Sequence, residues 1–247
     1  MGKQANDVAR ASRPWITRKM RVPHEILEAK ALEAQIASRI SSLPIPNTAN
    51  VRAVRRQYSR QIASCPPEMV IDLASRLLEG SHQLRFVGYE LILHHKPALQ
   101  SLNAGLLHRL GQGLDSWEAV DTFASYLAGP AWRERQVSDK LIHSWARSPD
   151  RWWRRAALVC TVPLNNKARG GSGDVARTLA VCEILVQDHD DMVEKAMSWA
   201  LRELAKRDQT AVQAFVREHQ EVLAARVIRE VKNKLQTGLK NPKSARL

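Results

Sequence analysis

The stretch KAMSWALREL, Lys195 to Leu204, has the clearest helical period in the chain. Apolar residues in it and just before it recur at intervals of three and four, which places them on one side of an α-helix: Val193, Ala196, Met197, Ala200, Leu201 and Leu204. The opposite side of the helix holds a tryptophan among cations: Lys195, Trp199, Arg202 and Lys206. At about 100° per residue, these four side chains fall within about 60° of one another around the helix axis. The apolar side predicts a buried face. Trp199 either packs on a neighbouring helix or belongs to a basic binding surface.

The same helical period recurs along most of the chain, and no segment alternates as a strand does. We expect helices at about residues 24–41, 50–63, 67–79, 83–95, 97–112, 116–127, 132–147, 151–162, 174–187, 190–206, 209–217 and 219–236. Short connections make neighbouring helices antiparallel, and pairs of about 35–40 residues are typical of HEAT or armadillo repeats. The sequence predicts an all-α, curved superhelical solenoid of HEAT-like antiparallel helix pairs. A compact helical domain without repeats is the alternative.

The amino-acid composition limits which binding partners and cofactors are expected for this protein. The net charge is +13 and the pI is about 10.2, which favours a polyanion such as nucleic acid over a merely soluble basic protein. The sequence contains no run of eighteen apolar residues, so it predicts no membrane-spanning helix. The three cysteines form no CxxC pair, which argues against a zinc site and a disulfide scaffold and favours a reduced, cytosolic compartment. We expect no metal and no other cofactor, and a cytoplasmic location of bacterial type, associated with the nucleoid.

Charge and glycine content divide the chain into one folded domain with basic extensions. We expect a basic arm at 1–23, a single helical-repeat domain at 24–238 and a basic tail at 239–247. The arm lacks the apolar segment of a secretory signal. The stretch NNKARGGSG, residues 165–173, predicts a flexible basic loop in which Lys167 and Arg169 are candidate DNA contacts. It lacks the GK[ST] ending of a nucleotide-binding loop.

The stretch DSWEAVDTF, Asp115 to Phe123, also has two distinct helical faces. One is an ordinary apolar stripe that continues past the stretch: Ala119, Val120, Phe123 and Leu127. Trp117 and Asp121 lie four apart on the other, and Asp121 is about 145° from the centre of the stripe. A tryptophan beside a carboxylate away from the core indicates a candidate site.

A third stretch, DRWWRRAAL from Asp150 to Leu158, combines two tryptophans with three arginines. Trp152, Ala156 and Val159 suggest one buried side. Arg154 and Arg155 both lie off it, and periodicity does not choose between them. Arginine suits phosphate because its guanidinium fork binds two oxygens, while a surface ion pair is the alternative.

Together, WEAVD (Trp117 to Asp121), WWRRAAL (Trp152 to Leu158) and KAMSWALRE (Lys195 to Glu203) resemble the core motifs of the AlkD-like alkylpurine DNA glycosylases, in the same order and at similar spacing. The resemblance covers roughly residues 50–235. It implies a curved array of HEAT-like helix pairs that acts on duplex DNA containing alkylated purines. Members of this family excise positively charged N3- and N7-alkylated purines, and a DNA-wrapping solenoid of this kind is expected to work as a monomer.

The resemblance also assigns roles to residues. It implies that Asp121 is the catalytic carboxylate, Trp117 the aromatic one turn before it, and Trp199 the second active-site tryptophan. The arginine that precedes the AA[IL] pattern falls on Arg155 rather than Arg154. The loop at 165–173 looks like an insertion, and PIPNTANVRAVRR replaces the family's usual Gly and Pro turn, which puts DNA contacts there in doubt.

The chemistry adds further expectations. Asp121 would stabilise an oxocarbenium-like sugar and position water, while Arg155 would lower the pKa of Asp121 and grip a phosphate. Lys195 is expected to contact phosphate rather than act as a lyase nucleophile. The full set of expected DNA contacts is Arg154, Lys195, Arg202, Lys206, Lys167, Arg169, Arg226 and Arg229. A non-catalytic binder of damaged or branched DNA and a protein-interaction scaffold are the competing functions.

Overall fold

The computed structural model describes residues 24–242, and every regular element in that range is helical. The expected arm at 1–23 and residues 243–247 of the expected tail lie outside the described residues. The elements, in chain order, are α1 (His24–Ser41), α2 (Thr48–Gln61), α3 (Pro67–Leu78), α4 (His82–Leu93), α5 (Lys96–Gln100), α6 (Ala104–Leu110), α7 (Trp117–Phe123), the π-helix η1 (Ala124–Ala128), α8 (Gly129–Arg133), α9 (Asp139–Ala146), α10 (Arg151–Cys160), α11 (Val162–Asn165), the 3₁₀-helix η2 (Lys167–Arg169), α12 (Val175–Ile184), α13 (Asp191–Leu204), α14 (Gln209–Glu218) and α15 (Ala225–Thr237).

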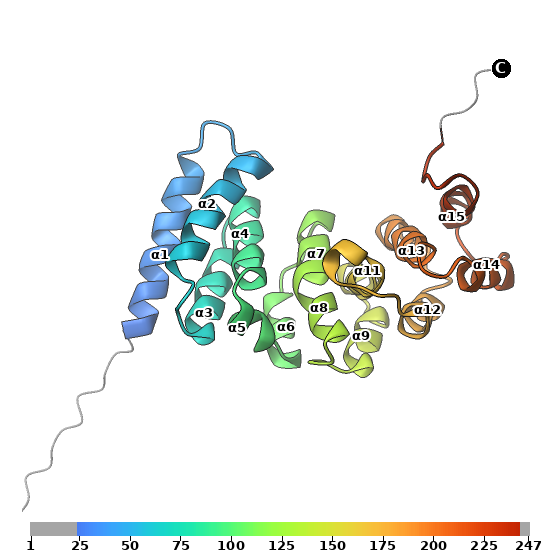
Figure 1. Cartoon of the computed structure of the whole chain (residues 1–247), viewed down its shortest axis with the longest axis horizontal. Helices are drawn as coiled ribbons and strands as arrows, with labels where there is room; N and C mark the ends of the chain where they lie inside the picture. Colours follow the sequence, from blue (N-terminus) through green and yellow to red (C-terminus); the bar gives the residue numbers. More distant parts are fainter. Residues whose placement is uncertain (1–23, 243–247) are drawn as a thin grey trace, which may run out of the picture.

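The helices stack side by side as an extended array that runs from α1 to α15 (Figure 1). Within it, α3 packs on α4, α9 on α10, and α12 on α13. The later helices of these groups also contact one another in sequence, as a row of α4, α7, α10, α13 and α15. Each layer therefore contacts mainly its neighbours, as in a solenoid. The all-α solenoid expected from the sequence is confirmed.

The core follows the row of helices. Both apolar stripes recognised in the sequence are buried: Ala119, Val120, Phe123, Leu127, Val193, Ala196, Met197, Ala200, Leu201 and Leu204. The thiols of Cys160 and Cys182 are fully buried in the same core. Burial raises the pKa of both thiols above the usual value. None of the helices in the described range combines the length and hydropathy needed to cross a bilayer.

The break expected between the helices at 116–127 and 132–147, where Gly129-Pro130 lies, is wrong, because the helix continues through these residues from α7 into α8. Proline disrupts an α-helix because its ring meets the carbonyl four residues earlier and it has no N–H to donate. Here the five-residue π-helix η1 immediately precedes this point, and the Gly129 N–H donates to the Ala124 carbonyl five residues back. The wider turn accommodates Pro130 within the helix.

Three other boundaries differ from the expected ones. The segment 97–112 divides into α5 and α6, because the Asn103 side chain caps α6 by accepting from the Leu106 N–H. The segment 132–147 begins as the end of α8, and Arg135 then adopts a left-handed φ of 62° before α9 starts. The last helix begins at Ala225 rather than near residue 219. A local cap and one left-handed residue thus decide the first two of these boundaries, which apolar spacing left open.

Candidate active site

Three neighbouring helices of the row, α7, α10 and α13, carry the three sequence motifs. Each helix starts just after a capping side chain that accepts a backbone N–H two or three residues on: Ser116 for α7, Asp150 for α10 and Asp190 for α13. Since α10 packs on both α7 and α13, one residue from each motif can meet at the same place. Asp121, Arg155 and Trp199 are those residues.

Asp121 and Arg155 form a two-point ion pair between α7 and α10. The Arg155 Nε donates to Asp121 Oδ1 at 3.0 Å, and the Arg155 Nη2 donates to Oδ2 at 2.9 Å. The Arg155 Nη1 donates to the Met192 carbonyl at the start of α13, at 2.5 Å. The Arg155 side chain is only 6% exposed and that of Asp121 18% exposed. The structure thus selects Arg155 over Arg154 as the partner of Asp121, which periodicity did not do.

The pKa of Asp121 is raised above the usual carboxyl value. Burial, which penalises the charged form, is the largest cause, and the hydrogen bonds and charge of Arg155 oppose it without reversing it. The expectation that Arg155 holds this pKa below normal is therefore wrong in net direction. All three Arg155 nitrogens already have protein acceptors, so the guanidinium serves Asp121 and Met192 in this arrangement.

An open cleft of about 590 Å³ exposes Asp121 on its wall. Trp117 and Trp199 line the same cleft. The Trp117 side chain is 51% exposed, whereas Trp199 is half-buried and also packs against the rim of the core. Both interpretations of Trp199 therefore apply, because the side chain packs against the core and also lines the cleft. The two tryptophans and the carboxylate come together as the sequence indicated.

The remaining walls of the cleft contain further residues, most of them outside the three sequence motifs. They come from the start of α2, the start of α4, the α7–η1 helix and the 165–173 loop: Pro46, Asn47, Thr48, Val51, His82, Gln83, Phe86, Glu118, Thr122, Ser125, Tyr126 and Arg169. Glu118 and Thr122 belong to the DSWEAVDTF stretch, Arg169 is an expected DNA contact, and the residues near the start of α2 belong to the PIPNTANVRAVRR stretch. The residues from α4 and η1 share no motif, because tertiary packing alone brings them to the cleft.

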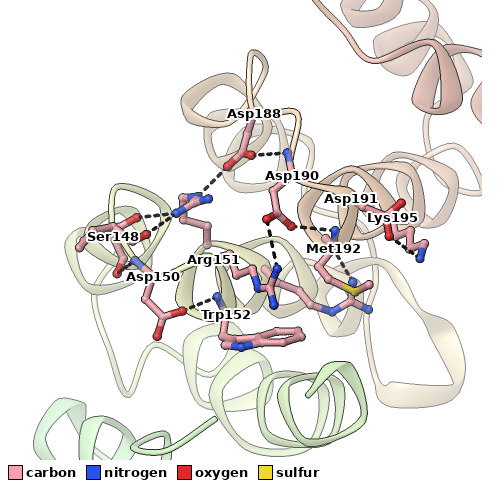
Figure 2. Close-up of polar contacts among 12 residues, drawn as sticks. Ser148, Asp150, Arg151, Trp152, Asp188, Asp190, Asp191, Met192 and Lys195 are labelled. Atoms are coloured by element: carbon pink, nitrogen blue, oxygen red, sulfur yellow. Dashed lines mark hydrogen bonds and ion pairs between the residues drawn. The ribbon is translucent and has the colours of Figure 1, made fainter. Parts of the chain in front are cut away.

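Arg154 lies away from the cleft and ties α10 to the segment before α13. Its Nε donates to Asp188 Oδ2 at 2.6 Å, and its Nη1 donates to the carbonyls of Ser148 and Pro149 at 3.1 and 2.7 Å. Figure 2 shows the neighbouring Arg151 reaching Asp190 in the same seam, at 3.7 Å. These ion pairs fix the relative placement of the helices that supply Arg155 and Trp199.

Most of the other expected DNA contacts are engaged with protein groups and do not line the cleft. Lys195 pairs with Asp191 at 2.6 Å, Arg226 also pairs with Asp191, and Lys206 pairs with Glu203 at 2.6 Å. The Arg202 Nε donates to Ser198 Oγ at 3.1 Å, and burial lowers its pKa. Lys167 and Arg229 are exposed and belong to no ion pair within the described part of the chain. Arg169 is the member of the set that enters the cleft.

No group of three or more His, Cys, Asp or Glu side chains among the described residues is placed to hold a metal ion. The adjacent histidines His94 and His95, which lie between α4 and α5, do not belong to such a group. His95 caps α5 by accepting the Ala98 N–H at its Nδ1, and burial lowers the pKa of His94.

Comparisons with known proteins bear on the family and the fold. Residues 29–235 match the family described as DNA alkylation repair enzyme. The solved structure of a predicted DNA alkylation repair enzyme from Enterococcus faecalis is similar, with a TM-score of 0.63 over 85% of this chain and 95% of that chain, at 16% sequence identity. At that identity the similarity shows the fold. No curated protein sequence matches the chain significantly. Because the family match spans all three motif helices and most of the array, the chain belongs to the DNA alkylation repair enzyme family, which supports a role in DNA repair.

Proposed function

We propose that this protein is a monofunctional DNA glycosylase that hydrolyses the N-glycosidic bond of cationic N3- and N7-alkylated purines in duplex DNA. One observation carries the proposal: Asp121, clamped at both oxygens by Arg155, faces an open cleft that Trp117 and Trp199 also line. We further propose that the protein acts as a monomer in the cytoplasm on DNA containing 3-methyladenine or 7-methylguanine.

The reaction suits a carboxylate without a cofactor. Alkylation at N3 or N7 gives the purine a positive charge, so the base leaves with the C1′–N bonding electrons as a neutral molecule. Positive charge then develops on the deoxyribose, and the Asp121 carboxylate stabilises it by charge. Water adds to C1′ on the free face of the sugar, and its proton passes to the carboxylate or to solvent.

The tryptophans supply surfaces for the charged nucleotide. The exposed Trp117 ring and the cleft-lining part of Trp199 offer electron-rich faces to a cationic purine and to sugar C–H groups. The cleft is an open groove that several helices border. This openness agrees with capture of a lesion that stays in or near the duplex, since flipped bases are held in snug pockets.

The test compares base release by the wild type and by Asp121→Asn on duplex DNA methylated at guanine N7 and adenine N3. Free 7-methylguanine and 3-methyladenine are measured by chromatography under single-turnover conditions. We expect the substitution to reduce the rate at least about 100-fold while DNA affinity is retained. Glu118→Gln is the matched control, because Glu118 lines the same cleft on the same helix, and its variant should retain most of the activity. Undiminished release by Asp121→Asn contradicts the assignment.

A non-catalytic binder of damaged DNA is the second candidate. The observation that favours it is the complete engagement of both Asp121 oxygens by Arg155, which leaves fewer lone pairs for a water molecule. This candidate predicts salt-sensitive binding to duplex DNA with no base release by the wild type.

A further inference from the structure

The basic loop at 165–173 is fixed to the solenoid, in contrast to the flexible loop expected from its composition. Arg133 donates through Nη1 to the Arg169 carbonyl and, at 3.5 Å, to the Pro163 carbonyl. Arg207 donates to the carbonyls of Asn165 and Gly171 at 2.7 and 3.2 Å. The loop backbone is therefore held from both sides by arginines of other elements.

The loop glycines are needed for this close approach. Gly170 has a left-handed φ of 83°, and a Cβ at Gly171 would lie 2.4 Å from the Pro163 carbonyl oxygen. Because a side chain at position 171 would clash with α11, glycine there lets the loop follow a path directly against this helix. That path places the side chain of Arg169 in the cleft.

Arg169 is held against the same helical turn that carries Asp121. Its Nη1 donates to Ser125 Oγ at 3.0 Å and to the Ser125 carbonyl at 3.2 Å. Ser125 Oγ in turn donates to the Asp121 carbonyl at 2.5 Å. The Arg169 guanidinium also lies over the Tyr126 ring, 4.9 Å from its centroid. The loop cation and the candidate catalytic carboxylate are thus parts of one connected wall.

The aromatic support of Arg169 is itself fixed from the other end of the cleft. The Arg52 Nη2 donates to the Tyr126 hydroxyl at 3.2 Å, and the Arg52 Nε donates to Glu90 Oε1 at 2.8 Å. Glu90, only 2% exposed, also accepts from the Arg55 Nε at 3.0 Å. This chain of contacts runs from α2 and α4 to η1 and positions the face on which Arg169 stacks.

The two arginines near Asp121 differ in what remains available to a ligand. Arg155 is buried, and its charge is paired with that of Asp121. Arg169 is partly exposed, lines the cleft, and belongs to no ion pair among those of the described residues. A guanidinium without a carboxylate partner, supported by stacking, is suited to bind a phosphate through two parallel hydrogen bonds.

We propose that Arg169 binds the DNA backbone phosphate next to the lesion, and that the 165–173 loop serves to deliver it there. The phosphate contact expected of Arg155 thereby passes to Arg169, while Arg155 acts as the positioning residue for Asp121. This division of roles rests on the proposed function, because it takes the cleft as the place where the lesion binds. The positive charge of Arg169 also lowers the pKa of Asp121, so the loop favours the ionised carboxylate.

The first test measures binding to a duplex that contains a tetrahydrofuran abasic-site analogue, over a series of NaCl concentrations. Arg169→Ala and Arg169→Gln should each reduce the slope of log K against log salt by about 1, as expected for the loss of one phosphate contact. Arg217→Ala is the matched control, because Arg217 is an exposed arginine on α14 that does not line the cleft, and its slope should equal that of the wild type.

The second test follows the pH dependence of 7-methylguanine release. Neutralising Arg169 should move the acidic inflection to higher pH, Arg169→Lys should restore it towards the wild-type value, and Arg217→Ala should leave it unchanged. An unchanged salt slope in both neutral Arg169 variants overturns the proposal, as does salt-insensitive binding by the wild type. If the wild type binds DNA but releases no base, the glycosylase proposal fails, while the salt slope still decides the role of Arg169.

Discussion

At the scale of single residues, Asp121 combines two opposing effects. Burial on the cleft wall raises its pKa, and Arg155 lowers it without compensating fully. A carboxylate with a raised pKa is a stronger base, yet a smaller fraction of it is ionised in acid. The pair therefore gives a carboxylate that is reactive towards water but sensitive to acidity.

This balance predicts how base release depends on pH. Because the ionised form is the active one, the rate should fall as pH decreases through the pKa of Asp121, with an inflection above the usual carboxyl value of about 3.9. Single-turnover release of 7-methylguanine across the acidic range measures it. In Glu118→Gln the inflection should shift to lower pH, because the charge of Glu118 raises the pKa of Asp121. A wild-type inflection at or below the usual value contradicts the account.

At the scale of elements, the continuous helix α7–η1–α8 sets the position of the cleft wall. The π-helix follows Asp121 within three residues and lets the chain pass Gly129-Pro130 without a break. Gly129 then lies so close to its neighbours that a Cβ would be 2.8 Å from both the Cys160 carbonyl oxygen and the Pro163 ring. The contact joins the helix of Asp121 to the end of the helix that carries Arg155.

Gly129→Ala should therefore force α8 away from α10 and α11. We expect a loss of about 1–3 kcal/mol in the free energy of unfolding, as for overpacking of a tight core, measured by urea denaturation. Gly105→Ala serves as the comparison, because a Cβ there meets its nearest atom at 3.4 Å, an ordinary contact, in helix α6. That variant should be at least as stable as the wild type. Equal stability of the two variants would show that the close approach is not strained.

At the scale of the whole molecule, the count of 38 lysines and arginines overstates the number of cations available to DNA. On the C-terminal helices, Lys195, Lys206 and Arg226 all have carboxylate partners at short range. Arg154 is paired as well and is largely buried with Asp188. Paired cations must give up or share these partners to contact a phosphate, so among the residues expected from the sequence to contact DNA, the unpaired ones should dominate binding.

Arg229→Ala and Arg154→Ala test this distinction. Arg229 is exposed and unpaired within the described residues, so its loss should reduce the salt slope of duplex binding by up to about 1. Arg154→Ala should leave the slope unchanged and instead lower the urea midpoint, because it breaks the contact between α10 and Asp188. Equal changes in slope for both variants would mean that ion pairing does not determine which cations meet DNA.

The sequence predicted those features that depend on local periodicity. The spacing of Trp117 and Asp121, and of Trp199 and its cations, follows directly from the helical repeat. The choice between Arg154 and Arg155 did not follow from periodicity, because both lie off the apolar side and only packing against α7 separates them. The fixed loop at 165–173 was also out of reach, since its anchors, Arg133 and Arg207, lie far from it in sequence.

The buried thiols of Cys160 and Cys182 have a consequence for the conditions in which a DNA alkylation repair protein works. Such a protein is needed when electrophiles that methylate DNA are present, and a cysteine thiolate is a nucleophilic side chain that such electrophiles readily alkylate. Both thiols are fully enclosed, and burial keeps them protonated at neutral pH. The core of the solenoid thus shields the thiols of Cys160 and Cys182 from the alkylating reagents whose DNA products the protein family repairs.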